Sequence, residues 1–403
     1  MLKIAVIFDQ KLYSGGGYKQ SINMLNLLKY FPEKKYSFTL YTTILRNKFK
    51  SKDNFLKFKY LKSSIIARLI SKIGINPRYV FIKNIIELLF PLNLLEKELE
   101  FDGVDLIFFI TPSNLAYDLY KLNYIYTIWD LCHLDNPEFP EIRLNNQFEI
   151  REKLYSKVLK KSSFIITDCE ENKKKIAKSY LVNRKKIITI PFEPSSKLTC
   201  EKNLEFESNL LKDRFNKKTK YLFYPAQYWA HKNHIYILKA LKILKSEEKS
   251  DFGVIFTGSD KGNLSFLKEY AFKNDLINDV IFLNFVSDND ISRIYQHAFA
   301  LVMPSYFGPS NLPPLEAFNF SLPVIYPDID EFVNQLNNTG IFVKLNDPKS
   351  LALAVSSLLK DDLLRKKIIS KGIKYISRDF KDKNFKKLEN IFDSYFAKRS
   401  CWN

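Results

Sequence analysis

The residues whose types and spacing best suit ligand binding lie in the stretch YFGPSNLPPLEAF, residues 306–318. Its paired prolines suit the first positions of a helix, where no backbone N–H is needed, and Ser310 or Asn311 would cap that helix. We expect Glu316 in the first turn, where its negative charge meets the positive end of the helix dipole. Because the apolar run FALVMPS precedes this stretch, the sequence predicts a strand, a tight loop and a helix N-terminus, a geometry that binds anions.

A second candidate for phosphate binding is the loop that contains Gly15, Gly16 and Gly17. The chain has only 11 glycines in 403 residues, and these three follow the apolar run KIAVIF. Glycine lets a backbone approach a ligand closely, so we expect this loop to contact a phosphate or an acceptor. The loop is not a dinucleotide-binding fingerprint, because Gln20 occupies the position of the third glycine. A helix is expected to begin near Tyr18.

Metal chemistry and membrane spans are not expected. The four cysteines are scattered and form no CxxC pair, which argues against a zinc site or a disulfide framework. No run approaches 18 uninterrupted apolar residues, and the first apolar run is too short for a signal peptide. We therefore expect a cytoplasmic protein.

Short apolar runs alternate with helical or polar segments through the chain. The runs are KIAVIF, YSFTLYTT, VDLIFFIT, NYIYTIWD, SFIITD and KIITIPF in the first half, and YLFYPA, FGVIFTG, VIFLNF, ALVMPS and PVIYPD in the second. This alternation predicts parallel sheets with helices on both faces. The fold class is α/β, with two doubly wound, Rossmann-like domains that face a ligand-binding cleft at the carboxyl ends of their strands.

The domain boundaries follow from these runs. We predict an N-terminal Rossmann-like domain at 1–192, a polar linker at 193–219 and a C-terminal Rossmann-like domain at 220–380. The remaining segment, 381–403, is expected to be a helix that packs back on the N-terminal domain.

The net charge of the chain is +19, and the excess is uneven. Residues 45–83 contain eleven Lys or Arg and one acid, Asp53, a net charge of +10. Basic residues alternate there with Phe, Leu and Ile, which suits a helix on an anionic bilayer. The alternative is an ordinary solvated basic face. The sequence is therefore compatible both with peripheral attachment to the inner face of the cell membrane and with a solvated basic surface.

Four segments of the second half resemble, in order and spacing, retaining nucleotide-sugar glycosyltransferases of group one, which have the GT-B fold. They are YPAQYWAHKNHIYILKAL, FTGSD, VIFLNFVSDNDISRIYQHAFALVMPSYFGPSNLPPLEAFNFSLPVIYPD and GIFVKLNDPKSLALAVSSLLKDDLLRKKI. The resemblance is strong from Lys220 to about Ile376, and it extends to the first domain through the glycine loop and TIWDLCHLDNPEFPE. Such enzymes assemble bacterial surface glycans, including lipopolysaccharide, O-antigen and capsule polysaccharide.

The resemblance implies a reaction and its substrates. We expect transfer of a hexose or deoxyhexose, with mannose or rhamnose favoured, from a nucleotide diphosphate sugar. The acceptor would be a polysaccharide or an undecaprenyl-linked glycan. Neither a metal nor a cofactor is expected to take part, and nucleic acid is not an expected partner.

The resemblance also implies a donor site in the second domain. Lys232 would place a positive charge near the diphosphate, the start of the helix would supply N–H donors, and Glu316 would accept from the ribose hydroxyls. The predicted donor-binding residues are Lys232, Glu316, Pro309, Ser310, Asn311, Leu312, Gly258 and Gln227. His231 and His234, on either side of Lys232, are expected to be exposed loop residues.

Two residues of the first domain are predicted to be catalytic. Trp129 stands before Asp130 where the family has a histidine, and His133 follows three residues later. We therefore predict His133 and Asp130 as catalytic residues, with His133 contacting the donor sugar or an acceptor hydroxyl. Gly308 occupies the position usual for a nucleophile, which leaves Asp130 and Asp9 as the nearest carboxylates. The pattern favours a front-face mechanism, in which the departing phosphate takes the acceptor's proton.

Some features depart from the family or suggest other functions. Gln227 replaces an arginine, which removes one positive charge from the phosphate site. Asp328 and Asp330 have the DxD spacing of metal-dependent glycosyltransferases, but those enzymes have a different fold. One alternative function is a sugar-nucleotide epimerase of the same fold, which would need no acceptor. A more remote alternative is a basic RNA- or membrane-binding protein without catalysis, although no motif for single-stranded nucleic acid is present.

Overall fold

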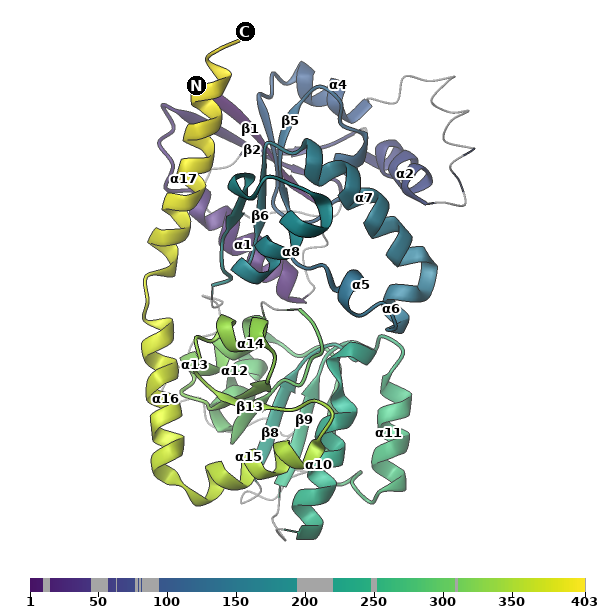
Figure 1. Ribbon diagram of the computed structural model, residues 1–403, viewed down its shortest axis with the longest axis vertical. Helices are drawn as coiled ribbons and strands as arrows, with labels where there is room; N and C mark the ends of the chain where they lie inside the picture. The colour runs from purple at the N-terminus through teal and green to yellow at the C-terminus, as the bar shows by residue number, and fades with distance from the viewer. Residues whose placement is uncertain are drawn as a thin grey trace. The chain divides into compact units, whose positions relative to one another are not determined.

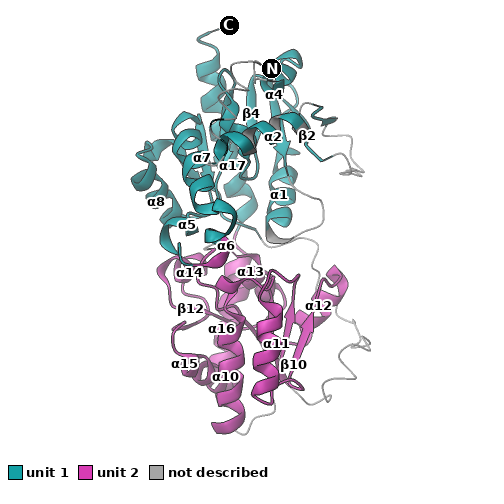
Figure 2. Ribbon diagram, turned by 90° about the vertical axis from the view of Figure 1, so that its right-hand side faces the viewer, with its two compact units in different colours: residues 1–138, 142–193, 379–403 teal, residues 139–141, 194–378 magenta. Residues whose placement is uncertain are grey.

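A computed structural model describes residues 1–9, 15–44, 57–62, 64–76, 79, 81, 94–193, 220–247, 252–308 and 311–402. The chain forms two compact units, shown in different colours in Figure 2. Unit 1 consists of residues 1–138, 142–193 and 379–403, and unit 2 of residues 139–141 and 194–378. Residues 45–56 of the basic segment and residues 194–219 of the predicted linker, 193–219, lie outside the described residues.

Unit 1 is built on a seven-stranded sheet with the order β3-β2-β1-β4-β5-β6-β7, in which every pairing is parallel. The strands are β1 Leu2–Phe8, β2 Tyr36–Thr42, β3 Lys57–Tyr60, β4 Leu106–Phe109, β5 Asn123–Thr127, β6 Phe164–Thr167 and β7 Ile187–Thr189. The helices are α1 Gly15–Leu28, α2 Ser64–Ile75, α4 Leu94–Phe101, α5 Cys132–Asp135, α7 Gln147–Lys161, α8 Glu170–Tyr180 and α17 Phe380–Arg399. The short helix α6, Pro140–Arg143, begins in unit 2 and ends in unit 1. Three 3₁₀ segments join them, η2 Asn114–Asp118, η3 Leu144–Asn146 and η4 Arg184–Lys186.

Helices cover both faces of this sheet. Successive side chains of a strand point to opposite faces, and the strands carry apolar side chains on both, so both faces must be buried. On β1, Ala5 and Ile7 belong to a cluster with apolar residues of α4, α7 and α8. Ile4, Val6 and Phe8 belong to a second cluster with apolar residues of α1 and α17. In Figure 1, α17 is the yellow helix that carries the C-terminus, and Phe392 at its centre packs against Phe31, Tyr36, Phe38 and Phe108.

Unit 2 contains a six-stranded parallel sheet with the order β10-β9-β8-β11-β12-β13. The strands are β8 Lys220–Pro225, β9 Phe252–Thr257, β10 Val280–Leu283, β11 Ala300–Val302, β12 Val324–Pro327 and β13 Ile341–Val343. The helices are η5 Ala230–Lys232, α10 His234–Glu247, α11 Leu264–Lys273, α12 Asp288–His297, α13 Leu312–Asn319, α14 Asp330–Gln335, α15 Pro348–Lys360 and α16 Asp362–Ile376.

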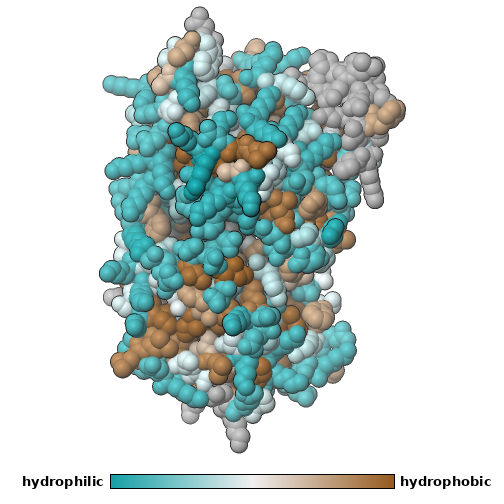
Figure 3. Space-filling view, in the orientation of Figure 1, coloured by the Kyte–Doolittle hydropathy of each residue, from teal (hydrophilic) through white to brown (hydrophobic). Residues whose placement is uncertain are grey.

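The surface of both units is largely hydrophilic, as Figure 3 shows for one face. Brown areas are visible on the lower half of that view, which is unit 2. The exposed apolar side chains of α15 and α16 are Leu353, Leu359, Leu363 and Ile373. Among the described residues, no helix is long and apolar enough to cross a membrane.

The predicted fold class is confirmed for both halves of the chain, since each forms a parallel α/β sheet with helices around it. Two local predictions were wrong. The helix expected near Tyr18 begins at Gly15, so the three glycines form its first turn rather than a loop before it. Glu316 is not in the first turn of α13, because that helix already begins at Leu312, ahead of both prolines.

Candidate functional site

In unit 2, Lys232 and the loop before α13 come together, as the anion-binding interpretation requires. Lys232 ends η5, and its Nζ donates to Ser305 Oγ at 3.2 Å. Ser305 is fully buried and in turn donates to the carbonyl oxygen of Phe307 at 2.8 Å. A methyl group added to Gly308 would lie 3.8 Å from the Lys232 ammonium. The lysine charge therefore lies directly at residues 305–308.

The start of α13 is well fixed. Asn311 is the N-cap residue, but its side chain makes no capping bond to the helix. Its Nδ2 donates instead to Tyr326 Oη at 2.7 Å and to the carbonyl oxygen of Gly308. Gln335 Nε2 donates to the carbonyl oxygen of Asn311 at 2.8 Å. Pro313 and Pro314 have no N–H, so the first turn offers an anion the N–H of Leu312 and the positive end of the helix dipole, and the Asn311 side chain does not cap it.

Three more residues of this loop were predicted to bind the donor. Of these, Pro309 and Ser310 lie outside the described residues. Leu312 is the first residue of α13, and its side chain is buried.

Glu316 is 3% exposed, which is unusual for a carboxylate. Its Oε2 accepts a hydrogen bond from Tyr295 Oη at 3.0 Å, a residue of α12. The Tyr295 ring is itself stacked on Phe320, with ring centroids 5.2 Å apart. Burial, and then the charge of Glu316, raises the pKa of Tyr295 well above its usual value, so the phenol remains a donor. The carboxylate is therefore oriented by a fixed partner.

A glycine is required at position 258, where β9 ends, because its φ is +154° and the backbone of the loop after β8 is very close. A Cβ at this position would lie 2.5 Å from the carbonyl oxygen of Ala226 and 2.7 Å from Gln227 Cα. Gln227 Oε1 accepts from Trp229 Nε1 at 3.0 Å, so this amide orients the indole ring. These contacts fix the loop that leads from β8 to Lys232.

The expectation that His231 and His234 are exposed was wrong, since they are 8% and 0% exposed. The His231 ring is stacked on Phe307 at 3.8 Å between centroids. His234 contacts the rings of Tyr224, Tyr228 and Phe256, at 4.7 to 5.1 Å between centroids.

The His234 Nε2 lies 3.3 Å from the carbonyl oxygen of Ala226. Burial lowers the pKa of His234 to about 3, so the ring is neutral at physiological pH.

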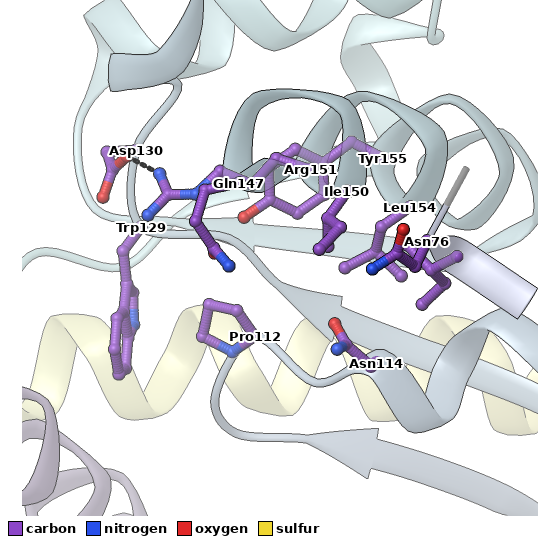
Figure 4. Close-up of a pocket in the computed structure, with 11 residues that line it drawn as sticks. Asn76, Pro112, Asn114, Trp129, Asp130, Gln147, Ile150, Arg151, Leu154 and Tyr155 are labelled. Carbon is purple, nitrogen blue, oxygen red and sulfur yellow. Dashed lines mark hydrogen bonds and ion pairs between the residues drawn. The ribbon is translucent and has the colours of Figure 1, made fainter. Parts of the chain in front are cut away.

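In unit 1, the carboxyl ends of β4 and β5 border a pocket of about 480 Å³, shown in Figure 4. One wall is formed by five residues of α7 at positions i, i+3, i+4, i+7 and i+8. Residues with this spacing lie on one face of a helix. These residues are Gln147, Ile150, Arg151, Leu154 and Tyr155. The opposite side is formed by residues that follow β4 and β5 and by the end of α2, and it consists of Pro112, Asn114, Trp129, Asp130, Ile75 and Asn76.

Asp130, one of the two predicted catalytic residues, lines this pocket. Its Oδ1 accepts from Arg151 Nη1 at 3.2 Å and from the backbone N–H of Cys132 at 3.1 Å. Burial alone would raise the pKa of Asp130, but the Arg151 charge and the bonds from Cys132 outweigh it and hold that pKa below the usual value. The residue is therefore an ionised carboxylate in an ion pair.

His133, the other predicted catalytic residue, lies behind this wall. Its side chain has no exposure, and its Nε2 lies 2.9 Å from Glu152 Oε1 and 3.3 Å from Tyr180 Oη. Tyr180 Oη also donates to Glu152 Oε1. Burial holds the pKa of His133 below its usual value, although Glu152 acts in the opposite direction. A neutral imidazole in this position does not reach solvent, so direct contact with a sugar is not supported.

The two other features predicted for unit 1 lie at the carboxyl end of β1. Gly15, Gly16 and Gly17 form the first turn of α1, where Ser21 Oγ donates to the carbonyl oxygen of Gly17 at 2.8 Å. Asp9 accepts from Ser113 Oγ at 2.7 Å and from Thr43 Oγ1, so it ties together the ends of β1, β2 and β4.

Sequence reasoning missed the pocket on α7. Asn114 follows a predicted strand and could have been included on that ground. Arg151 and Gln147 belong to a helix with no motif, and only the fold brings them to Asp130.

Comparison with known proteins identifies the family of the second half. Residues 206–375 match the family described as glycosyl transferases group 1. The chain is 28% identical over 202 residues to the O-antigen chain mannosyltransferase RfbU of Salmonella typhimurium, a match that covers 50% of this chain and 52% of that protein. The chain spans about half the length of the curated relatives that it matches.

Solved structures share the fold over nearly the whole chain. One is WaaG, a glycosyltransferase involved in lipopolysaccharide biosynthesis, with a TM-score of 0.68, 14% identity and coverage of 96% of this chain and 99% of that chain. Another is Anabaena Alr3699/HepE in complex with UDP, with a TM-score of 0.67, 13% identity and coverage of 98% and 100%. The predicted GT-B fold class is confirmed, and the predicted family is confirmed for residues 206–375, which form a glycosyltransferase domain of group 1.

Proposed function

We propose that this protein is a retaining, metal-independent glycosyltransferase that moves a hexose or deoxyhexose from a nucleotide diphosphate sugar to a glycan acceptor. Mannose is the favoured sugar, because the relative in Salmonella is named an O-antigen chain mannosyltransferase. The acceptor is a polysaccharide or a lipid-linked glycan of the bacterial surface. The observation that carries the proposal is the position of Lys232 Nζ, 3.2 Å from Ser305 Oγ, in the loop that leads to the start of α13 in the matched domain.

This arrangement suits a departing diphosphate. As the bond between the anomeric carbon and the phosphate oxygen breaks, its electron pair stays on the diphosphate, and negative charge grows there. A lysine ammonium and the positive end of the α13 dipole stabilise that charge without a metal ion. The buried Glu316 carboxylate, oriented by Tyr295, accepts from the two ribose hydroxyls of the nucleotide.

The acceptor hydroxyl completes the reaction on the same face of the sugar. Its oxygen bonds to the anomeric carbon, and its proton moves to the oxygen of the departing phosphate. The pairing of Asp130 with Arg151 supports an orienting role for that carboxylate rather than a nucleophilic one. We assign His133 as a positioning residue, which holds α7 through Glu152.

A donor screen followed by mutation tests the proposal. Thermal shifts against GDP-, UDP- and dTDP-sugars identify the donor, because a bound ligand stabilises the folded state. Lys232→Ala and Glu316→Ala are each expected to lower kcat/KM by about 10²–10³-fold, the scale for loss of one charge-stabilising group.

Lys239→Ala is the matched control, because Lys239 is an exposed lysine on α10, the helix that follows Lys232. Unchanged donor affinity and turnover in both variants would refute the assignment of Lys232 and Glu316 to the donor site. Release of the nucleotide at full rate without any acceptor would indicate an epimerase or a hydrolase instead.

We also propose that unit 1 associates with an anionic membrane surface. On α2, Ile66 and Leu69 are 53% and 62% exposed, and their spacing places them on one face of the helix. On β3, Phe58 is exposed between Lys57 and Lys59, which are exposed as well. Exposed apolar side chains with adjacent lysines support insertion at a negatively charged bilayer surface.

A further inference from the structure

The pocket on α7 has a chemical character that defines what it can bind. Three of its lining side chains are carboxamides, Asn76, Asn114 and Gln147. A carboxamide offers both donors and an acceptor, and so does a sugar hydroxyl, whereas a phosphate oxygen only accepts. The lining therefore matches a polyhydroxylated group better than an anion.

The charges in the pocket lead to the same conclusion. Among the described residues that line it, the charged side chains are Arg151 and Asp130, and they are paired at 3.2 Å. Their formal charges cancel. An anion that approached the guanidinium would also meet the carboxylate, and the pKa of that carboxyl lies below its usual value, so it remains ionised.

The apolar lining is distributed in a way that suits a sugar. Figure 4 shows Trp129 at one end of the pocket and Asn76 with Asn114 at the other, with Pro112 between them. An indole ring is a platform on which the C–H face of a pyranose packs, and its polar edges then meet the amides. A purely aliphatic chain would remove Gln147 and Asn114 from water without offering them a hydrogen bond, at a substantial cost in free energy.

The walls are held in place before any ligand arrives. Ser113 caps η2 through a bond from Leu115 N to its Oγ at 3.2 Å, which positions the adjacent Asn114. Asn172 Nδ2 donates to the carbonyl oxygen of Trp129 at 2.8 Å. Arg151 Nη1 also lies 3.0 Å from Cys132 Sγ. Such preorganisation lowers the entropic cost of binding.

We infer that this pocket binds an uncharged glycosyl residue of the acceptor, through Gln147, Asn114 and the Trp129 ring, and not a phosphate group. The inference rests on the proposed function, since it names which part of a glycan acceptor unit 1 recognises. It differs from that function in what it predicts, because saccharide binding here needs no nucleotide sugar.

Binding to the full-length protein without donor tests the inference. A glycan array of neutral bacterial saccharides selects a probe, and calorimetry then compares it with mannobiose, mannose 1-phosphate and inorganic pyrophosphate. The neutral probe is expected to bind, with affinity lowered about three- to tenfold in Gln147→Ala and in Asn114→Ala, the scale for one lost hydrogen-bonding group. Glu149→Gln is the matched control, because Glu149 is exposed on the same helix and does not line the pocket.

The outcomes separate the two proposals. Neutral saccharide binding that falls in both variants, with no donor binding or transfer, would leave the inference standing and remove the proposed function. Transfer activity with an unchanged acceptor KM in both folded variants would overturn the inference alone. Anionic probes whose binding falls in the same variants, or the absence of any neutral ligand on the array, would overturn it as well.

Discussion

Acidification should destabilise unit 2 through one residue, His234. The side chain has no exposure, and among the described residues its Nδ1 has no hydrogen-bond partner. Its pKa is about 3 in the folded protein, against 6.5 in the unfolded chain. Below pH 6.5 the unfolded chain therefore binds a proton that the folded chain does not, and stability falls until the pH reaches about 3. Between pH 7.5 and 5.0 the expected loss is about 2 kcal/mol from this group alone.

A comparison with His234→Phe isolates this contribution, because phenylalanine keeps an aromatic ring but does not titrate. Urea unfolding, followed by fluorescence of Trp229 in a chain where Trp129 and Trp402 are changed to Phe, gives the free energy of unfolding of unit 2. The difference between pH 7.5 and 5.0 should be about 2 kcal/mol smaller in the variant, since contributions from other groups cancel.

Direct titration provides a second assay, because the chain has only four histidines. The ring-proton NMR signal of His234, assigned by its loss in the variant, should not shift between pH 8 and 5. A midpoint near 6.5, or equal pH dependence of the two proteins, would refute the reasoning.

Two further predictions concern the backbone and the surface. Gly258→Ala should reduce the free energy of unfolding, measured in urea, by about 2–4 kcal/mol, because its methyl group would meet the Ala226 carbonyl oxygen at 2.5 Å. Gly262→Ala is the control for backbone strain alone, since Gly262 also has a positive φ, +98°, but open space around it. An equal loss of stability in the two variants would contradict the close approach at Gly258. A double variant, Ile66→Asp with Leu69→Asp, should no longer float with anionic liposomes at low salt, whereas the parent protein should. Equal flotation of the parent protein with neutral and anionic vesicles would exclude the membrane proposal.

The sequence predicted the scaffold well because strands buried on both faces are continuous apolar runs. β4 and β9 are of this kind, and so are the buried parts of β5 and β8, whose ends determine where the loops with Asp130 and Lys232 lie. Short strands were harder to predict. β3 is the exposed sequence KFKY, which has no apolar run to mark it.

The side-chain environments could not be predicted in the same way. His133 follows Asp130 closely in sequence, yet one turn of α5 directs it into the core toward Glu152. His234 looks like a polar loop residue, but α10 begins there and packs it among aromatic rings. The partner of Asp130, Arg151, comes from α7, and local sequence carries no information on that pairing.

The position of α17 has a consequence for how the chain is made. Unit 2 is complete at Arg378, but the core of unit 1 also requires Leu388, Ile391, Phe392 and Tyr395. A ribosome therefore releases all of unit 2 before the last helix of unit 1 exists. The nascent first unit must wait with the apolar face for Phe392 exposed, although domains made first usually fold first. For this protein the order in which the two units are synthesised is therefore the reverse of the order in which they can be completed.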